Sequence, residues 1–265
     1  MKYVIYIVSL TILAFSPSVL SQDLQGKIYY VSKSKVNTDF GQRQLSEAQK
    51  ARIKTRQNEA STKSHVLVFN NNESLFSEEV KASQNVAQNS SRSGGGGFRQ
   101  FLFSQNYGTY YLNTDTKLYV AQKEIYGKQF LIQDTLPELN WQRTDEVKTI
   151  GKYLCFKAIL NASKSKDSTN TNNNAPLITA WYTIEIPLST GPETYWGLPG
   201  AILELHTENM VYLCSRIELI LKETGAIKPP RKGKKIEKEE YDKLLDKKAK
   251  EIKELNQNRR FGGKN

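Results

Sequence analysis

The sequence predicts a mainly β protein: an antiparallel meander that forms a curved sheet or half-open barrel, with one covering helix and a basic C-terminal helix. Three observations lead to this prediction. Short segments rich in Tyr, Phe, Val and Ile recur along the chain, clusters of Asn, Asp, Ser and Gly separate them, and the separations are mostly too short for intervening helices. Strands spaced this closely pair as antiparallel neighbours rather than as βαβ units.

The first 21 residues have the pattern of a signal peptide. A positive start is followed by an almost continuous apolar run over residues 3–15, which is too short for a comfortable membrane span. A buried N-terminal helix is the alternative, but the run lacks a polar face. We expect cleavage after Ser21 and export through the signal peptide to the periplasm or the outer-membrane surface.

Residues 22–225 are expected to form the antiparallel β domain, and its strands are rich in aromatic and β-branched residues. The expected strands are residues 27–31, 65–69, 74–76, 98–103, 108–112, 117–120, 128–132, 152–160, 177–186, 201–205 and 211–219. The last two flank the turn-like residues 207–209 and predict a β-hairpin.

Three segments interrupt this pattern of strands. Residues 40–59 contain helix-forming residues with a weak apolar stripe, and predict either the covering helix or an exposed loop. Residues 81–97, which end in four glycines, and residues 162–174, nearly all Ser, Asn, Lys, Asp and Thr, are too polar to form a core. We expect both to be flexible insertions, with a functional lid as the less favoured interpretation.

Residues 226–265 are expected to be a basic linker followed by an amphipathic helical tail. From residue 222 onwards there are fifteen Lys and Arg against eight Asp and Glu, which is seven of the net charge of +11. Tyr241, Leu244, Leu245, Ile252 and Leu255 share one helical face. That face packs on the β domain or docks on an envelope protein or an anionic membrane surface; in an exported protein, nucleic acid is not an expected partner.

Two cysteines, Cys155 and Cys214, lie in separate strand-like segments. An even number of cysteines in an oxidising compartment permits a disulfide, which would stabilise the fold by roughly 4 kcal/mol, and two separately buried thiols are the alternative. Neither cysteine has the CxxC spacing or the adjacent histidine of a metal or redox site.

Several short motifs occur together between Trp141 and Leu205. They are Lys148-Thr-Ile-Gly151, Cys155-Phe-Lys-Ala158, Ala180-Trp-Tyr-Thr183, Glu185-Ile-Pro187, Gly191-Pro192 and Gly197-Leu-Pro-Gly-Ala-Ile-Leu203. In this order they resemble the GLPGLI family of exported proteins, known chiefly from Bacteroidota. The chain departs from that pattern at Ala201, where the name motif has leucine, and in the insertion before Pro176. The resemblance implies a cell-envelope setting and no established reaction.

Residues 195–200 are expected to form a rigid crossover, because Pro199 fixes one bend and two glycines permit unusual backbone angles. Two interpretations remain open for Trp181, Trp196, Leu198, Pro199 and Gly200. They plug one end of the β core, or they line a groove for an apolar or peptide ligand on the concave face of the sheet.

No motif for catalysis, cofactors or phosphate binding stands out in a fitting context, so we expect no cofactor and no metal. Glu204 and His206 can share one face of a strand, which alone makes a weak metal site. With Glu185 they form the one candidate for an unrecognised hydrolase site. The sequence thus favours an exported binding or adaptor protein over an enzyme; an envelope hydrolase is the alternative.

Overall fold

The computed structural model describes residues 24–35, 46–49, 62–79, 108–125, 127–161, 177–220 and 226–261. The predicted signal peptide, the insertions at residues 81–97 and 162–174, and the strand at residues 98–103 lie outside the described residues. So does most of the predicted helix at residues 40–59, of which residues 47–49 are helical.

The described chain confirms the mainly β prediction, because it forms one open sheet of 12 strands. In chain order the strands are β1 (Gln25–Ser34), β2 (Thr62–Phe69), β3 (Glu73–Glu78), β4 (Gly108–Asn113), β5 (Leu118–Ile125), β6 (Lys128–Thr135), β7 (Gln142–Ile150), β8 (Tyr153–Asn161), β9 (Leu177–Thr183), β10 (Ala201–His206), β11 (Met210–Ile220) and β12 (Lys234–Ile236). The helix α4 (Lys238–Phe261) follows the last strand.

The sheet consists of two antiparallel meanders that meet at its centre. Its strand order is β12-β6-β5-β4-β3-β2-β1-β11-β10-β9-β8-β7. One meander runs outward from β1 to β6, and the other runs inward from β7 to β11, which pairs with β1. The predicted hairpin is confirmed as β10 and β11. Its turn is closed by a hydrogen bond of 2.8 Å from the Thr207 N–H to the Met210 carbonyl.

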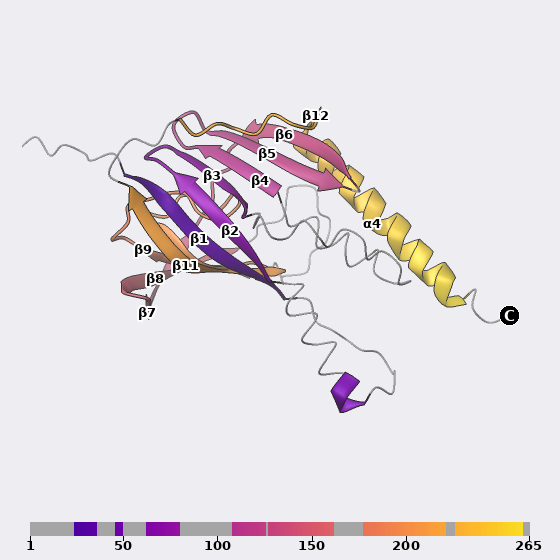
Figure 1. Ribbon diagram of the computed structural model, residues 1–265, viewed down its shortest axis with the longest axis horizontal. Coiled ribbons are helices and arrows are strands. Elements are labelled where there is room, and N and C mark those ends of the chain that lie inside the picture. The colour runs from indigo at the N-terminus through magenta and orange to yellow at the C-terminus, as the bar shows by residue number, and fades with distance from the viewer. Residues whose placement is uncertain are drawn as a thin grey trace, which may run out of the picture.

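The connection from β6 to β7 requires the sheet to curl. Nine strands lie between them in the sheet order, which corresponds to about 48 Å along the sheet. The connecting residues 136–141 reach at most about 25 Å even when fully extended. The two ends of the sheet must therefore approach each other, which gives the curved shape in Figure 1.

The hollow of the curled sheet is filled by an aromatic and aliphatic core. Its largest fully buried side chains include Tyr30, Phe76 and Tyr212, and the ring centroids of Phe76 and Tyr212 are 5.7 Å apart. The segment at residues 184–200 adds Ile186 and Leu198 to the same core. Core side chains thus occupy much of the concave face.

The C-terminal segment wraps around the β6 edge of the sheet. Ile227 packs on the small outer cluster of Tyr111, Val120 and Leu131. β12 then pairs in parallel with β6, and α4 places Tyr241 in the inner core, where its ring centroid lies 5.8 Å from that of Phe130. In Figure 1, α4 starts beside β5 and β6 and continues beyond the sheet.

The predicted disulfide is not formed in the structure, where Cys155 and Cys214 are both free thiols. They lie on β8 and β11, with β9 and β10 between these strands. Three strand spacings amount to about 14 Å along the sheet, whereas the Cα atoms of a disulfide lie within about 7 Å of each other. Burial raises the pKa of both thiols, that of Cys214 to about 11.

Candidate functional site

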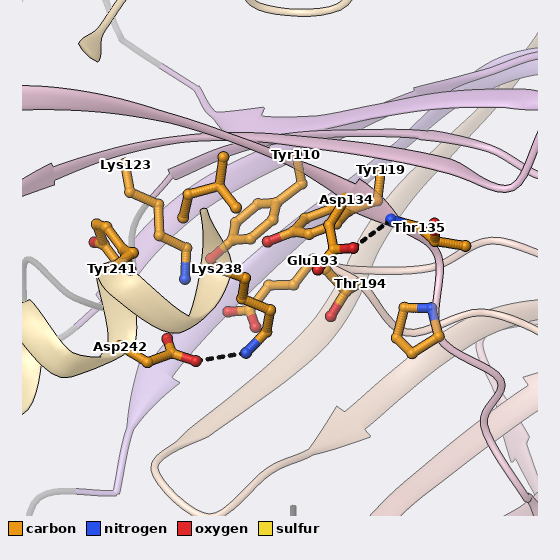
Figure 2. A pocket seen from close by; sticks show the side chains of 12 residues that line it. Tyr110, Tyr119, Lys123, Asp134, Thr135, Glu193, Thr194, Lys238, Tyr241 and Asp242 are labelled. Carbon is orange, nitrogen blue, oxygen red and sulfur yellow. Dashed lines mark hydrogen bonds and ion pairs between the residues drawn. The ribbon is translucent and has the colours of Figure 1, made fainter. Parts of the chain in front are cut away.

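A cavity of about 230 Å³ lies at one end of the core, where three parts of the chain meet. The inner face of β4, β5 and β6, the turn at residues 192–195 and the first turn of α4 form its walls (Figure 2). Its lining residues are Tyr110, Tyr119, Lys123, Ile132, Asp134, Thr135, Pro137, Glu193, Thr194, Lys238, Tyr241 and Asp242. We call this cavity the Lys123 pocket.

Lys123 projects from β5 into this space (Figure 2). Its Nζ lies 5.3 Å from the ring centroid of Tyr110 and 5.7 Å from that of Tyr241. Among the described residues its ammonium group makes no hydrogen bond or ion pair. Burial lowers the pKa of Lys123, while the negative charges of Glu193 and Asp242 oppose that shift. The aromatic faces therefore stabilise a cation whose three N–H donors remain available.

Glu193 enters the pocket from the turn at residues 192–195, which the Tyr195 N–H closes by donating to the Pro192 carbonyl at 3.1 Å. The backbone of Glu193 has a φ of 54°, which is uncommon for a residue with a side chain. The hydroxyl of Tyr212 donates a hydrogen bond to its carboxylate. Burial raises the pKa of Glu193, although that hydrogen bond and the charge of Lys123 act to lower it.

Three tyrosines form the aromatic walls of the pocket. Tyr110, Tyr119 and Tyr241 are each at most 5% exposed, and burial raises the pKa of all three, that of Tyr119 to about 12. Their hydroxyl groups therefore stay protonated and able to donate at neutral pH. The buried hydroxyl of Tyr241 has no hydrogen-bond partner among the described residues. This oxygen is fully buried, so Tyr241 contributes the face of its ring to the pocket rather than a hydrogen-bond donor.

The remaining charged side chains are at the rim. Lys238 and Asp242 form an ion pair at 2.6 Å within the first turns of α4. Asp134, at the other side of the cavity in Figure 2, accepts a hydrogen bond of 2.6 Å from the backbone N–H of Thr135. The pocket thus combines aromatic faces with charges of both signs, an arrangement suited to binding a small polar molecule.

The predicted crossover residues lie at the junction between the two ends of the sheet. Leu198 is 2% exposed in the core, Pro199 is exposed, and Gly200 lies against the backbone of Thr183. The Trp196 indole donates to the Pro137 carbonyl at 2.7 Å, and the Trp141 indole donates to the Trp196 carbonyl at 2.8 Å. These contacts favour the interpretation of a plug, and a ligand-binding role for these residues stays a prediction.

Trp181 lies elsewhere, on the outer side of β9. Lys148 and Lys157 cover its ring, with Nζ to centroid distances of 4.2 and 5.9 Å. The neighbouring residue across the sheet on β10 is Glu204, which pairs with Lys148 at 2.7 Å. Trp196 has a different basic neighbour, Lys117, whose Nζ lies 4.3 Å from its ring centroid, so the two tryptophans lie in different surroundings.

Glu204 and His206 share a strand face as predicted, with 2.6 Å between Glu204 Oε1 and His206 Nε2. Burial would raise the pKa of Glu204, but the hydrogen bonds from Lys148 and His206 lower it below its usual value. Glu185 does not join them, since it is exposed and accepts the Leu154 N–H at 3.1 Å. The geometry of this trio does not favour the hydrolase alternative.

Within the described ranges, no group of three or more His, Cys, Asp and Glu is arranged to hold a metal ion. The described helices likewise include none with the length and apolarity needed to cross a membrane.

Sequence reasoning missed the Lys123 pocket. Lys123 lies in a polar part of a strand, Glu193 in a turn and Tyr241 in the tail, so no local motif joins them. Two signals were present nonetheless: a lysine follows the buried run of β5, and Tyr241 begins the apolar stripe of α4.

Comparison with protein families gives one match. Residues 161–204 match a family described as "Protein of unknown function (Porph_ging)". The match includes the motif at residues 197–203 and covers less than half of the chain. The match supports similarity to a family of unknown function, and it does not confirm the GLPGLI name. No curated protein matches the chain.

Comparison with solved structures gives low similarity to two structures of PNGF-II. The structure in the C2 space group has a TM-score of 0.48 and 12% identity, and the structure in the P21 space group has a TM-score of 0.49 and 13% identity. Both matches cover 84% of this chain. The chain spans about a third of the length of those proteins, 32% and 33% respectively.

Proposed function

We propose that this protein is an exported binding or adaptor protein of the cell envelope, of the GLPGLI type, and that it binds a small polar ligand in the Lys123 pocket. The observation that carries the proposal is the ammonium group of Lys123. It faces a cavity between two tyrosine rings, and no acceptor among the described residues satisfies it. Holding a cation in this way costs desolvation free energy, which a ligand acceptor would offset.

The chemistry of the pocket narrows the class of ligand. An apolar ligand would leave the Lys123 ammonium group without an acceptor, whereas a peptide offers donors, acceptors and apolar side chains together. Of the two ligand classes that the sequence suggested, the peptide is therefore the better fit to this pocket.

The envelope setting rests on the sequence. The apolar run at residues 3–15 supports export through a signal peptide to the periplasm or the outer-membrane surface. The ordered motifs, which overlap the residues matched by the family model, support membership of the GLPGLI group. Exposed lysines of α4, including Lys243, Lys247 and Lys250, would contact an envelope protein or an anionic membrane surface.

The test is native mass spectrometry of the protein purified from its own envelope. Wild-type protein should carry a small molecule that Lys123→Met loses while melting as a folded protein. Lys152→Met is the matched control, because Lys152 also lies 5.3 Å from a tyrosine ring centroid, that of Tyr153, but outside the pocket. Wild-type protein with no bound molecule, or equal occupancy in wild type and Lys123→Met, would refute the proposal.

A further inference from the structure

The Lys123 pocket has an uneven distribution of charge. Lys123 and Tyr241 lie toward one side in Figure 2, Asp134 and Thr135 lie toward the other, and Glu193 projects between them. Because Lys238 and Asp242 pair with each other at 2.6 Å, they largely neutralise each other. The charges left for a ligand are one cation and the carboxylates of Asp134 and Glu193.

A ligand that carries charge of only one sign is repelled by at least one charged group of this pocket. A simple anion would pair with Lys123 but lie near Asp134 and Glu193, while a simple cation would meet those carboxylates but also Lys123. In a partly buried site, unlike charges attract and like charges repel more strongly than they do in bulk water. A molecule that carries both charges, some distance apart, satisfies both groups.

Each side of the pocket has groups for one end of such a molecule. Lys123 can donate to a carboxylate, and the ring of Tyr241 lies beside it, with its centroid 5.7 Å from Lys123 Nζ. On the other side the Asp134 carboxylate accepts only the N–H of the adjacent Thr135 among the described residues, so it has further acceptor capacity for an ammonium group. The tyrosine rings add faces that attract a cation.

The size of the pocket limits the ligand. Its volume of about 230 Å³ lies below the range of roughly 300–1,000 Å³ for pockets that hold drug-sized ligands. We propose that the pocket binds a small zwitterion, an α-amino acid or short peptide with free ends, with its carboxylate on Lys123 and its ammonium group toward Asp134. This inference rests on the proposed function and specifies its ligand.

The test compares four probes by isothermal titration calorimetry: alanine, dialanine, N-acetyl-dialanine and dialanine amide. Dialanine should bind at least tenfold more tightly than either blocked form, because each blocked form lacks one of the two charges. Alanine distinguishes a free amino acid from a peptide as the source of the same chemistry. Binding of an unblocked probe that is at least tenfold tighter than the binding of both blocked forms supports a zwitterion site.

Two variants assign the ends of the ligand. Lys123→Met should abolish the preference for dialanine over its amide, and Asp134→Asn should abolish the preference for dialanine over its N-acetyl form. Lys152→Met should leave both preferences intact. Melting curves of each variant check that it is folded.

Equal affinity for dialanine and both blocked forms would overturn the zwitterion proposal, and so would undetectable binding of all four probes. Neither result would refute the broader binding function, which depends instead on the molecule that co-purifies with the native protein. If the native protein contains no bound molecule but prefers dialanine to its blocked forms, the proposed function is refuted. The zwitterion preference of the pocket is then still supported.

Discussion

His65 on β2 lies in the core between two aromatic rings. Its ring is stacked on Phe76 with a centroid distance of 5.1 Å and meets Tyr212 edge-on at 5.6 Å. Its Nε2 lies 2.9 Å from the hydroxyl of Ser32. Burial, and then the charge of Lys63, lowers the pKa of His65 from 6.5 to about 4. Tyr212 in turn donates a hydrogen bond to Glu193, so one aromatic residue connects His65 with the pocket.

We predict that His65 makes the fold less stable in mild acid. Between pH 6.5 and 4 the unfolded chain binds a proton at this residue and the folded protein does not. Stability from neutral His65 is therefore fully present above pH 6.5 and is lost as the pH falls toward about 4, by roughly 3 kcal/mol. Urea unfolding at several pH values should show a smaller loss for His65→Gln; the same pH slope in both proteins would contradict this account.

Two glycines of the crossover have different physical roles. A Cβ on Gly200 would lie 2.0 Å from the carbonyl oxygen of Thr183, so the residue permits a close backbone approach. Gly197 has a φ of 91° and open space around the position of a Cβ. The first position is restricted by packing and the second by backbone conformation.

We predict that Gly200→Ala destabilises the protein more than Gly197→Ala. The alanine at 197 should cost about 1–3 kcal/mol in backbone strain. The alanine at 200 should cost more, because the rigid backbone of Thr183 must move. Chemical denaturation of both variants checks the order, and equal losses would show that the crossover adapts to the added methyl group.

At the scale of the element, the C-terminal segment is part of the sheet as well as a basic tail. Gly233 has a φ of 123° and lies against the backbone of Phe130 as the chain reaches the edge of β6. β12 follows, and Tyr241 is then 1% exposed inside the core. The amphipathic stripe is thus covered at its start by the chain itself, while the side chains of Ile252 and Leu255 lie outside the described part of the chain.

Two truncations separate these roles. A chain that ends after residue 233 loses β12 and the buried Tyr241, which should cost about 3–5 kcal/mol and lower the melting temperature by at least about 6 °C. A chain that ends after residue 250 retains these contacts, and it should melt close to the full chain. Equal melting of all three chains would show that the segment is a detachable appendage.

The sequence predicted the strands whose side chains are aromatic or β-branched, and missed two others. β7 has mostly exposed, charged residues because it is one edge of the sheet, and β12 is a three-residue strand within a run of lysines. Their pairing depends on tertiary position rather than on local composition. The Lys123 pocket depends in the same way on contacts between distant segments.

At the scale of the whole molecule, one feature links the fold to the proposed function. The short connection between β6 and β7 forces the sheet to curl, and most of the enclosed space is filled with core side chains. Space remains where β4, β5 and β6 meet the turn at residues 192–195 and the start of α4. The meanders and the C-terminal helix thereby bring Lys123, Glu193 and Tyr241 around one cavity.

The most direct test of this account is a crystal structure of the protein purified from its native envelope, at a resolution that distinguishes a ligand from water. We predict electron density for a small polar molecule in the Lys123 pocket, with an acceptor group within hydrogen-bond distance of Lys123 Nζ. A pocket that contains only water, or a Lys123 side chain bonded directly to Glu193 so that the cavity closes, would contradict the claim that this is a ligand-binding site.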